Sequence, residues 1–362
     1  MRAMVLRRAA PLVERANPLE AADVPAPVPA AGELLVRVSV CGVCRTDLDL
    51  AEGRLAAPRY PVIPGHQVVG RVASLGAQAS RFREGDRVAA PGTAPGFREG
   101  DRVGVAWIHS ACGACRWCRA GEENLCPDFR ATGCHADGGY AEYLTVPAAF
   151  AHAIPAAFTD AEAAPLLCAG AIGWRALRLA KLENGEPLGL TGFGASAHLV
   201  LQLARRRYPQ SPVYVFARSA DERVFARELG AAWTGDTADD PPTPLAAIID
   251  TTPAWKPVVE ALRCLSPGGR LVVNAIRKEK RDQEELLRLE YPSHLWMERE
   301  VKSVANVTRA DVRDFLSAAS EMGIRPTANE VPLEQANEAL AWLRSGEAIR
   351  GARVLRVGED TG

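Results

Sequence analysis

The sequence predicts an α/β protein with two parts, a β-rich N-terminal part and a doubly wound parallel sheet. Three observations support this fold class. Residues 1–150 are dense in Gly and Pro and contain few helical periods, which indicates irregular β-structure. From about residue 160, β-branched runs alternate with helical patterns of about ten residues, as in βαβ units. A G-x-G-x-x-A pattern lies between one of these strands and the next helix.

The elements follow in order along the chain. Strands are predicted at 33–40 and 66–76, and the segment 160–182 has helical spacing. Further strands are predicted at 188–193, 213–218, 246–252 and 269–276, separated by helices at 195–207, 221–231 and 255–265. Two helices and a last strand between 309 and 357 end the chain, and this strand can rejoin the first part. The expected boundaries are 1–152, 153–296 and 297–362.

Composition limits the classes of function. The chain has 362 residues and is 48% hydrophobic, enough for roughly two domains with full cores. Its 43 basic and 44 acidic residues give a formal charge of −1, so no nucleic-acid partner is expected. The longest apolar-looking run, 188–204, is too polar and too short to span a membrane. We therefore expect a soluble, cytoplasmic protein.

A short tandem repeat interrupts the N-terminal part. "FREGDRV" occurs at 82–88 and again at 97–103. Two copies are too few for a solenoid, so we interpret the repeat as a local duplication that lengthens a surface loop. The second copy runs directly into the following apolar segment, and we expect it to take the strand position.

Nine cysteines, an odd number, are expected to be thiols or metal ligands in a reducing compartment. Four of them, Cys112, Cys115, Cys118 and Cys126, have the spacing C-x2-C-x2-C-x7-C. Four thiolates at short spacing can surround one tetrahedral zinc and leave no position for water or substrate, so such a site is structural. An iron–sulfur cluster is the alternative that the same thiolates allow.

Cys44, His66 and Cys168 form a second candidate set. Cys44 follows a predicted strand, His66 lies between a Pro-Gly turn and a strand, and Cys168 is expected at the start of a helix. Two thiolates and one imidazole leave a fourth position open for water or a substrate oxygen. Spacing alone does not select these three residues, because a lone histidine or cysteine more often packs in a core.

The glycine pattern predicts a dinucleotide site. Gly192 allows the tight turn, Gly194 lets the backbone approach a pyrophosphate, and Ala197 permits close packing of helix on strand. The next strand runs into Ala217, Arg218 and Ser219, without the carboxylate that usually binds the ribose hydroxyls of NAD. Arg218 can bind a 2′-phosphate, so NADP(H) is favoured and NAD(H) remains possible. The alternative is a solvated Arg218, with Ser219 capping the next helix and Glu222 completing a capping box.

The motifs together resemble a known family. "CGVCRTD", "PGHQVVGRV", the four-cysteine lobe, "DGGYAEY", "PLLCAG" and "GFGASA" occur in the order seen in zinc-dependent alcohol dehydrogenases of the medium-chain dehydrogenase/reductase superfamily. This resemblance covers almost the whole chain. It implies a GroES-like catalytic domain, a Rossmann domain, two zinc ions per chain, a small alcohol or aldehyde substrate, and a homodimer or homotetramer.

The resemblance also implies roles for single residues. Cys44, His66 and Cys168 match the catalytic zinc ligands, on which an alkoxide forms before hydride transfer. Thr46 matches the hydroxyl that starts the proton relay, and Asp47 matches the carboxylate that orients the histidine. Trp107 matches a residue of the substrate pocket, where an indole favours slim primary or flat aryl substrates, unless it only packs in the core. The expected cofactor-binding residues are Arg45, Gly192, Phe193, Gly194, Ala195, Ser196, Ala217, Arg218, Ser219 and Arg350.

Two positions depart from the family pattern, and one residue is ambiguous. Gln67 stands where the family usually has Glu, and it cannot act as a carboxylate ligand. Asp49 stands where many members have a relay histidine, which leaves the proton route open. His135 is either a pocket residue or a surface residue. Cys41 is expected to be structural.

Two competing functions remain. Within the superfamily, a polyol or aryl-alcohol dehydrogenase differs only in the shape of its pocket. A non-catalytic redox sensor that binds zinc and a dinucleotide would also use the lobe and the glycine loop. Such a module would not need Thr46 beside Cys44, nor a three-ligand set with an open fourth position.

Overall fold

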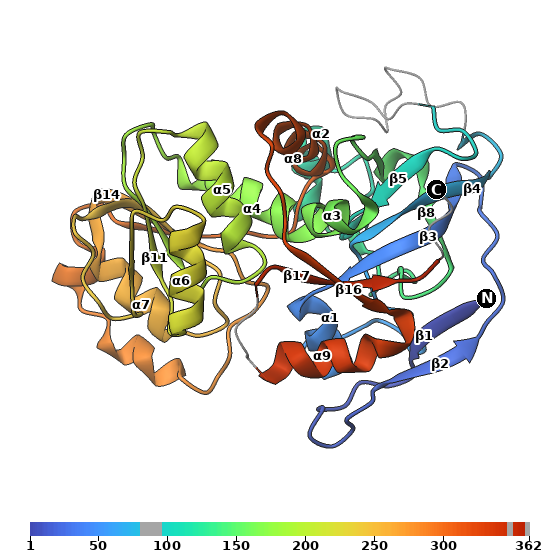
Figure 1. The fold of residues 1–362 in the computed structure, drawn as a ribbon, viewed down its shortest axis with the longest axis horizontal. Coiled ribbons are helices and arrows are strands. Elements are labelled where there is room, and N and C mark those ends of the chain that lie inside the picture. Colours follow the sequence, from blue (N-terminus) through green and yellow to red (C-terminus); the bar gives the residue numbers. More distant parts are fainter. Residues whose placement is uncertain (80–95, 346–349, 359–362) are drawn as a thin grey trace.

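The computed structural model describes residues 1–79, 96–345 and 350–358, and two main sheets lie side by side in it (Figure 1). The middle of the chain makes a six-stranded sheet, and segments from both ends of the chain share a seven-stranded sheet. The predicted α/β class is therefore confirmed.

The six-stranded sheet is parallel throughout and has the order β12–β11–β10–β13–β14–β15. Its strands are β10 (Leu188–Thr191), β11 (Val213–Phe216), β12 (Trp233–Gly235), β13 (Leu245–Asp250), β14 (Leu265–Val273) and β15 (Glu300–Ser303). The helices α4 (Ala171–Ala180), α5 (Ala197–Arg207), α6 (Ala220–Glu228) and α7 (Lys256–Arg263) accompany it. The strand order reverses between β10 and β13, and this switch point is where such sheets bind ligands.

The central strands read as continuous apolar runs because both faces of the sheet are covered. Every residue of β10 and of β11 is buried. A parallel sheet with helices on both faces requires such strands, whereas an exposed face would demand polar alternation. The predicted strands and helices between 188 and 276 are confirmed, with small shifts at their ends.

The seven-stranded sheet joins the N-terminal part to the C-terminus. Its main path is β16 (Ala328–Pro332), β17 (Ala352–Arg356), β3 (Glu33–Val43), β4 (Val68–Leu75), β5 (Arg102–Val105) and β9 (Ala151–Ala153), and β8 (Tyr143–Pro147) also pairs with β3. Two smaller pairs are β1 (Arg2–Leu6) with β2 (Leu19–Asp23), and β6 (Ile108–Ser110) with β7 (Arg130–Ala131). Because β17 pairs with β3, the expectation that the last strand rejoins the first part is confirmed.

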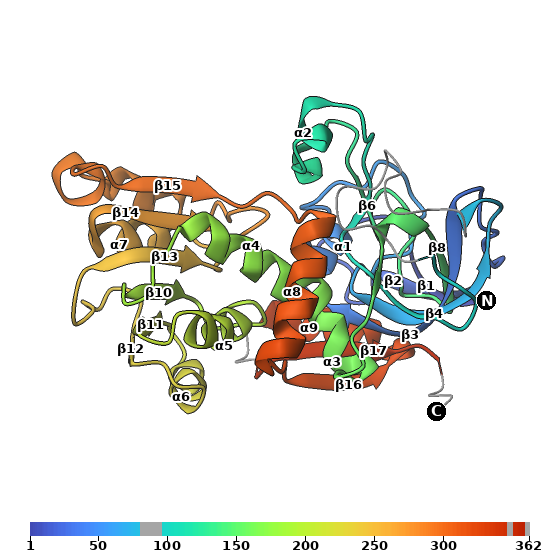
Figure 2. The same ribbon diagram turned by 90° about the horizontal axis from the view of Figure 1, so that it is seen from above.

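The remaining helices accompany the seven-stranded sheet or lie at the junction of the two sheets. They are α1 (Arg45–Ala51), α2 (Arg116–Arg119), α3 (Asp160–Pro165), α8 (Arg309–Met322) and α9 (Ala336–Ser345). The single-turn elements are η2 (Glu123–Leu125), η3 (Ala148–Phe150), η4 (Leu166–Gly170), η5 (Gln283–Arg288), η6 (Tyr291–Leu295) and η7 (Leu333–Gln335). Figure 2 shows α3, α4 and α8 at the junction of the two sheets, while α2 stands out from the body. None of the helices in the described residues has the length and apolar character that a bilayer span requires.

Three expectations need correction or completion. The parallel sheet continues to Ser303, past the boundary at 296, because β15 pairs with β14. Cys168 does not start a helix: it lies in the π-helical turn η4, between α3 and α4. The second copy of the repeat leads into β5 as expected, and the first copy, 82–88, lies outside the described residues.

A buried carboxylate fastens α8 to α4. Asp311 is 0% exposed and accepts hydrogen bonds from Arg175 Nη1 (2.8 Å) and Arg178 Nη1 (2.7 Å). It also completes a capping box with Thr308. We predict that Asp311→Asn lowers the free energy of unfolding by about 3–5 kcal/mol, because it leaves two arginines without their counter-charge.

Chemical denaturation measures this loss, and Asp314→Asn on the same helix is the matched control. Asp314 pairs with Arg313 at the surface, where an ion pair contributes about 0–1 kcal/mol. Equal losses in the two variants would contradict the role of Asp311.

Candidate functional site

Three donor atoms from separate segments of the chain meet at one point. Sγ of Cys44, a ring nitrogen of His66 and Sγ of Cys168 all lie within 4.8 Å of one another. Sγ of Cys44 is 3.3 Å from Nε2 of His66. The set predicted from sequence is thus brought together, and it has the composition and spacing to hold a divalent cation with one position open.

Local structure explains how each donor reaches this point. Cys44 directly follows β3 and is the N-cap residue of α1, so it lies where the chain changes from strand to helix. Gly65 has a φ of +99°, and a Cβ on it would lie 2.4 Å from the ring of Tyr140. The turn before His66 therefore requires glycine. Cys168 comes from the π-helical turn η4, which re-aims one side chain in an otherwise continuous helical stretch.

Asp47 supports the histidine from behind. It is 2% exposed, and its Oδ1 lies 3.2 Å from Nδ1 of His66, without the alignment of a full hydrogen bond. Its Oδ2 accepts the backbone N–H of Cys44 at 2.9 Å, which closes a capping box on α1. One carboxylate therefore restrains two of the three donors and leaves Nε2 of His66 facing Cys44.

The three donors share their charge. The hydrogen bond with Cys168 lowers the pKa of Cys44 to about 5, although burial opposes this. The same bond, together with burial, raises the pKa of Cys168. Burial alone would lower the pKa of His66, but Cys44 and Asp47 outweigh it and raise the pKa to about 10. A cation could replace these shared protons, so the donor chemistry fits a metal.

Aromatic and polar side chains surround the donors. The ring of Trp107 stands edge-on to His66, with 4.9 Å between centroids, and is 9% exposed. Thr46, half-buried on α1, donates its backbone N–H to Sγ of Cys44 at 3.4 Å. Cys41 is fully buried, and its thiol contacts the carbonyl of Gly42, as expected for a structural residue.

The two departures from the family pattern have different surroundings. Gln67 is buried, and within the described residues its Nε2 has no hydrogen-bond partner. Asp49 is 1% exposed and accepts hydrogen bonds from Arg54 and Arg277, each at 2.8 Å. Arg277 follows β14, so this bond joins the two parts of the molecule directly beside α1.

The second cysteine set also converges. Cys112, Cys115, Cys118 and Cys126 have sulfur atoms within 4.8 Å of one another. Backbone N–H groups of Cys112, Cys115 and Cys118 point at sulfur atoms of the set, at 3.3 to 3.5 Å. Such donors stabilise thiolates, and backbone bonds from Ala114 and Cys115 are the main cause that lowers the pKa of Cys112 to about 6. The four thiolates fit one tetrahedral metal.

The glycine loop lies at the switch point of the parallel sheet. Gly192 has a φ of +75°, and a Cβ on it would lie 2.9 Å from Cγ2 of Thr252. A Cβ on Gly194 would have no atom within 4 Å in the described part of the chain. Ala197 starts α5 fully buried. This is the arrangement that admits a pyrophosphate at the N-terminus of α5.

Packing and hydrogen bonds to the protein interior fix the rest of the glycine loop. Phe193 is buried edge-on against Phe225, so only its backbone can face a cofactor. The hydroxyl of Ser196 donates to the carbonyl of Ala169 and accepts from Asn274. Ala195, between them, is half-buried.

A buried ion pair beside this loop was not expected from the sequence. Lys278 pairs with Asp250 at the end of β13 and also donates to the carbonyls of Thr252 and Ala254. Asp250 is 0% exposed and accepts from Thr191 at 2.6 Å. In the sequence, only a lysine after β14 indicated this pair, and a lysine in a loop is usually exposed to solvent.

Arginines gather at the end of β11. Ala217 is buried, Arg218 is exposed, and the Ser219 hydroxyl caps α6 by accepting the N–H of Glu222 at 3.5 Å. Arg223, which the sequence analysis did not single out, donates to the carbonyls of Ala217 and Arg218. Two arginines, and no carboxylate residue among 217–219, therefore lie at the end of β11, where a carboxylate is usual in NAD-binding proteins.

The remaining predicted residues make their contacts with other parts of the protein. Arg350 contacts Glu228 of α6 at 3.0 Å and lies over the ring of Phe225. Arg45 donates to the carbonyl of Leu343 at 3.3 Å. His135 lines a cavity of about 470 Å³ together with His109, and none of the three donor residues lines that cavity.

Comparison with known proteins agrees with this geometry. The family model for the alcohol dehydrogenase GroES-like domain matches residues 30–94 and 90–156. The probable alcohol dehydrogenase AdhA of Mycobacterium tuberculosis (strain CDC 1551 / Oshkosh) is 46% identical over 362 residues, covering 99% of this chain and 97% of the relative. An alcohol dehydrogenase of Geobacillus stearothermophilus is 32% identical, covering 98% and 100% of the two chains.

A solved structure extends the likeness to three dimensions. A cinnamyl alcohol dehydrogenase of Sorghum bicolor (SbCAD4) superposes with a TM-score of 0.79 at 25% identity, over 98% of this chain and 97% of the other. The chain belongs to the zinc-dependent alcohol dehydrogenases of the medium-chain dehydrogenase/reductase superfamily.

Proposed function

We propose that the protein is a zinc-dependent, NADP(H)-preferring alcohol dehydrogenase that interconverts primary or aryl alcohols and their aldehydes. The observation that carries this proposal is the convergence of Cys44, His66 and Cys168 within 4.8 Å, next to the glycine loop, whose Ser196 hydroxyl donates to the carbonyl of Ala169. The names of the full-length relatives support the reaction class. They do not favour a non-catalytic module.

Each residue of the site has a defined task in this reaction. Cys44, His66 and Cys168 would hold the metal, and Asp47 keeps His66 oriented. A bound zinc ion supplies a Lewis acid that makes the hydroxyl of an alcohol more acidic. We propose that the Thr46 hydroxyl takes the proton of that hydroxyl and passes it toward solvent. A nicotinamide dinucleotide held by the glycine loop would supply the acceptor for the hydride.

The route of the proton beyond Thr46 differs from the family pattern. Asp49 already accepts two arginine hydrogen bonds, and both reach the same oxygen, Oδ1. A carboxylate held in this way serves as a fixed counter-charge rather than a mobile relay. We therefore propose that the proton leaves Thr46 for solvent without passing through Asp49.

The preference for NADP(H) rests on Arg218 and Arg223 at the end of β11. We predict that replacing both by Gln raises the KM for NADPH about tenfold or more and leaves the KM for NADH nearly unchanged, because only NADPH has the 2′-phosphate. Parallel assays of an alcohol and aldehyde panel with both cofactors measure this and test turnover itself.

The matched control for these variants is Arg206→Gln. Arg206 lies in the last turn of α5, at the edge of the sheet opposite the carboxyl ends of the strands. A wild-type enzyme that prefers NADH would refute the cofactor assignment, and a panel without any turnover would refute the function.

Metal content separates the enzyme from a binding module. We predict two zinc ions per chain, one of which a chelator removes readily with loss of activity. Asp47→Asn should lower the affinity for that ion about 10–100-fold, because His66 loses the carboxylate that orients it. Asp314→Asn, on the exposed side of α8, is the control. One tightly held zinc without turnover would instead support the non-catalytic alternative.

The glycine loop provides a matched pair of substitutions. Gly192→Ala should lower the free energy of unfolding by about 1–3 kcal/mol, since φ is positive and Thr252 is in the way. Gly194→Ala should leave stability within about 0.5 kcal/mol, because its Cβ points into open space, but should raise the KM for the cofactor. Thermal unfolding and cofactor titration of both variants measure this, and an unchanged KM in Gly194→Ala would argue against a pyrophosphate at this loop.

We also propose that the protein is a homodimer or homotetramer joined along β15. Strand β15 is exposed along its length. Large apolar side chains nearby are also exposed: Tyr291, Leu295, Trp296, Met297 and Val301. Such an edge is a template for pairing with a second copy. A solution mass equal to one chain of 38.8 kDa would exclude this assembly.

A further inference from the structure

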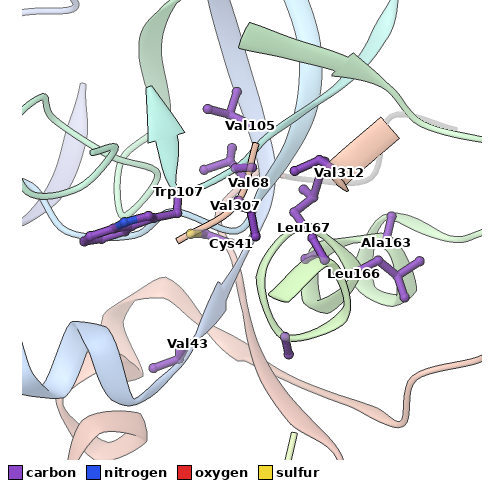
Figure 3. Packing of buried hydrophobic residues seen from close by; sticks show 14 of the residues in the cluster. Cys41, Val43, Val68, Val105, Trp107, Ala163, Leu166, Leu167, Val307 and Val312 are labelled. Carbon is purple, nitrogen blue, oxygen red and sulfur yellow. The ribbon is translucent and has the colours of Figure 1, made fainter. Parts of the chain in front are cut away.

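A single hydrogen bond fixes the tryptophan beside the metal ligands. Nε1 of Trp107 donates to Oδ1 of Asn306 at 2.9 Å, across 199 positions of sequence. The indole also contacts the ring of His66, which stands edge-on to it. Trp107 also belongs to the buried hydrophobic cluster that contains Val307 (Figure 3). Packing limits how far the ring can shift, and the hydrogen bond selects its orientation.

The backbone of Asn306 has a left-handed conformation, in the connecting segment from which its side chain reaches Trp107. Its φ is +53°, a left-handed conformation that asparagine tolerates better than most residues. It lies in the segment 304–308, which leads from β15 to α8 and thus connects the two sheets. The position of the Asn306 side chain therefore depends on the backbone path of the segment 304–308.

The four-cysteine lobe holds this segment on both sides of Asn306. Nδ2 of Asn124 donates to the carbonyl of Ala305 at 2.7 Å. Oε1 of Glu123 accepts from the backbone N–H of Arg309 at 3.0 Å and from its Nε at 2.9 Å. Both lobe residues are buried, and they lie in η2, between Cys118 and Cys126.

We propose that Asn306 is a specificity-determining positioning residue, and that the four-cysteine lobe acts through it to set the width of the substrate pocket. The connection runs from Glu123 and Asn124 to the segment around Asn306, and from there to Trp107 beside His66. Substrate selection rests on the proposed function, whereas the contact with Trp107 does not. With the bond in place the indole stays against His66 and admits slim substrates. Without it the indole turns aside and admits bulkier ones.

The test uses two substitutions that both tolerate a positive φ. Asn306→Gly removes the amide and keeps the backbone, whereas Asn306→Asp keeps an acceptor oxygen. We expect Asn306→Gly to raise kcat/KM for branched alcohols relative to ethanol by roughly five- to tenfold, the effect of one ordinary hydrogen bond. The change should appear mainly in KM. Asn306→Asp should keep the wild-type ratio.

A double-mutant cycle shows whether the effect passes through the indole. Trp107→Phe keeps a ring but has no N–H to donate. In that background Asn306→Gly should change the ratio no further. An additional change of the same size would overturn the proposed connection between Asn306 and Trp107.

A second readout does not depend on activity. The indole N–H of Trp107, assigned in 1H–15N spectra by its loss in Trp107→Phe, should exchange with solvent slowly in the wild type and at least tenfold faster in Asn306→Gly. Equal exchange rates would refute the proposal even in an active enzyme. If no alcohol is turned over, the proposed function fails, and the exchange rates still decide whether Asn306 holds the indole.

The role of the lobe has its own variant and control. Asn124→Ala removes the bond to Ala305 and should move the substrate ratio and the exchange rate in the same direction as Asn306→Gly. Asn184→Ala, which removes a surface amide bonded to Gln210, should move neither. If Asn306→Gly has the expected effect and Asn124→Ala has none, the lobe does not act through this segment.

Discussion

The structure depends on holding two sulfur atoms and one imidazole together in a buried place. Cys44, His66 and Cys168 belong to segments that are distant in sequence and have no local reason to meet. Bringing polar and ionisable groups out of water is unfavourable unless each finds a partner. Here the three share hydrogen bonds and charge, and Asp47 restrains two of them from one carboxylate. The strand end, the Pro-Gly turn and the π-helical turn all serve this convergence.

Polar bonds also connect the two parts of the molecule. Arg277, beyond the end of β14, reaches Asp49 on α1, and Arg350 reaches Glu228 on α6. Lys278, next to Arg277, is fastened to Asp250 inside the parallel sheet. The residues after β14 are thus bonded both to the parallel sheet, through Lys278, and to α1, through Arg277. This gives the two parts of the molecule a definite relation at the point where a cofactor and a substrate would meet.

Local patterns predicted much of the architecture. The alternation of apolar runs and helical spacing after residue 160 predicted the parallel sheet, because both faces of that sheet are covered and its strands must be apolar throughout. The edge strand β15 was missed, since its residues are exposed and carry no periodic signal. Cys168 was expected at the start of a helix, because a π-helical turn inside a helical stretch has no distinct sequence pattern.

The sequence by itself determined the four-cysteine set and the glycine turn, because these are local motifs with fixed spacing. It pointed to Cys44, His66 and Cys168 only through the resemblance of the ordered motifs to a known family. Only the tertiary structure decided which residues touch across long separations. Asp49 meets Arg277 across 228 positions, and Trp107 meets Asn306 across 199. Such contacts arise from how sheets and connecting segments pack, and a hydrogen bond between distant side chains leaves no pattern in the neighbouring sequence.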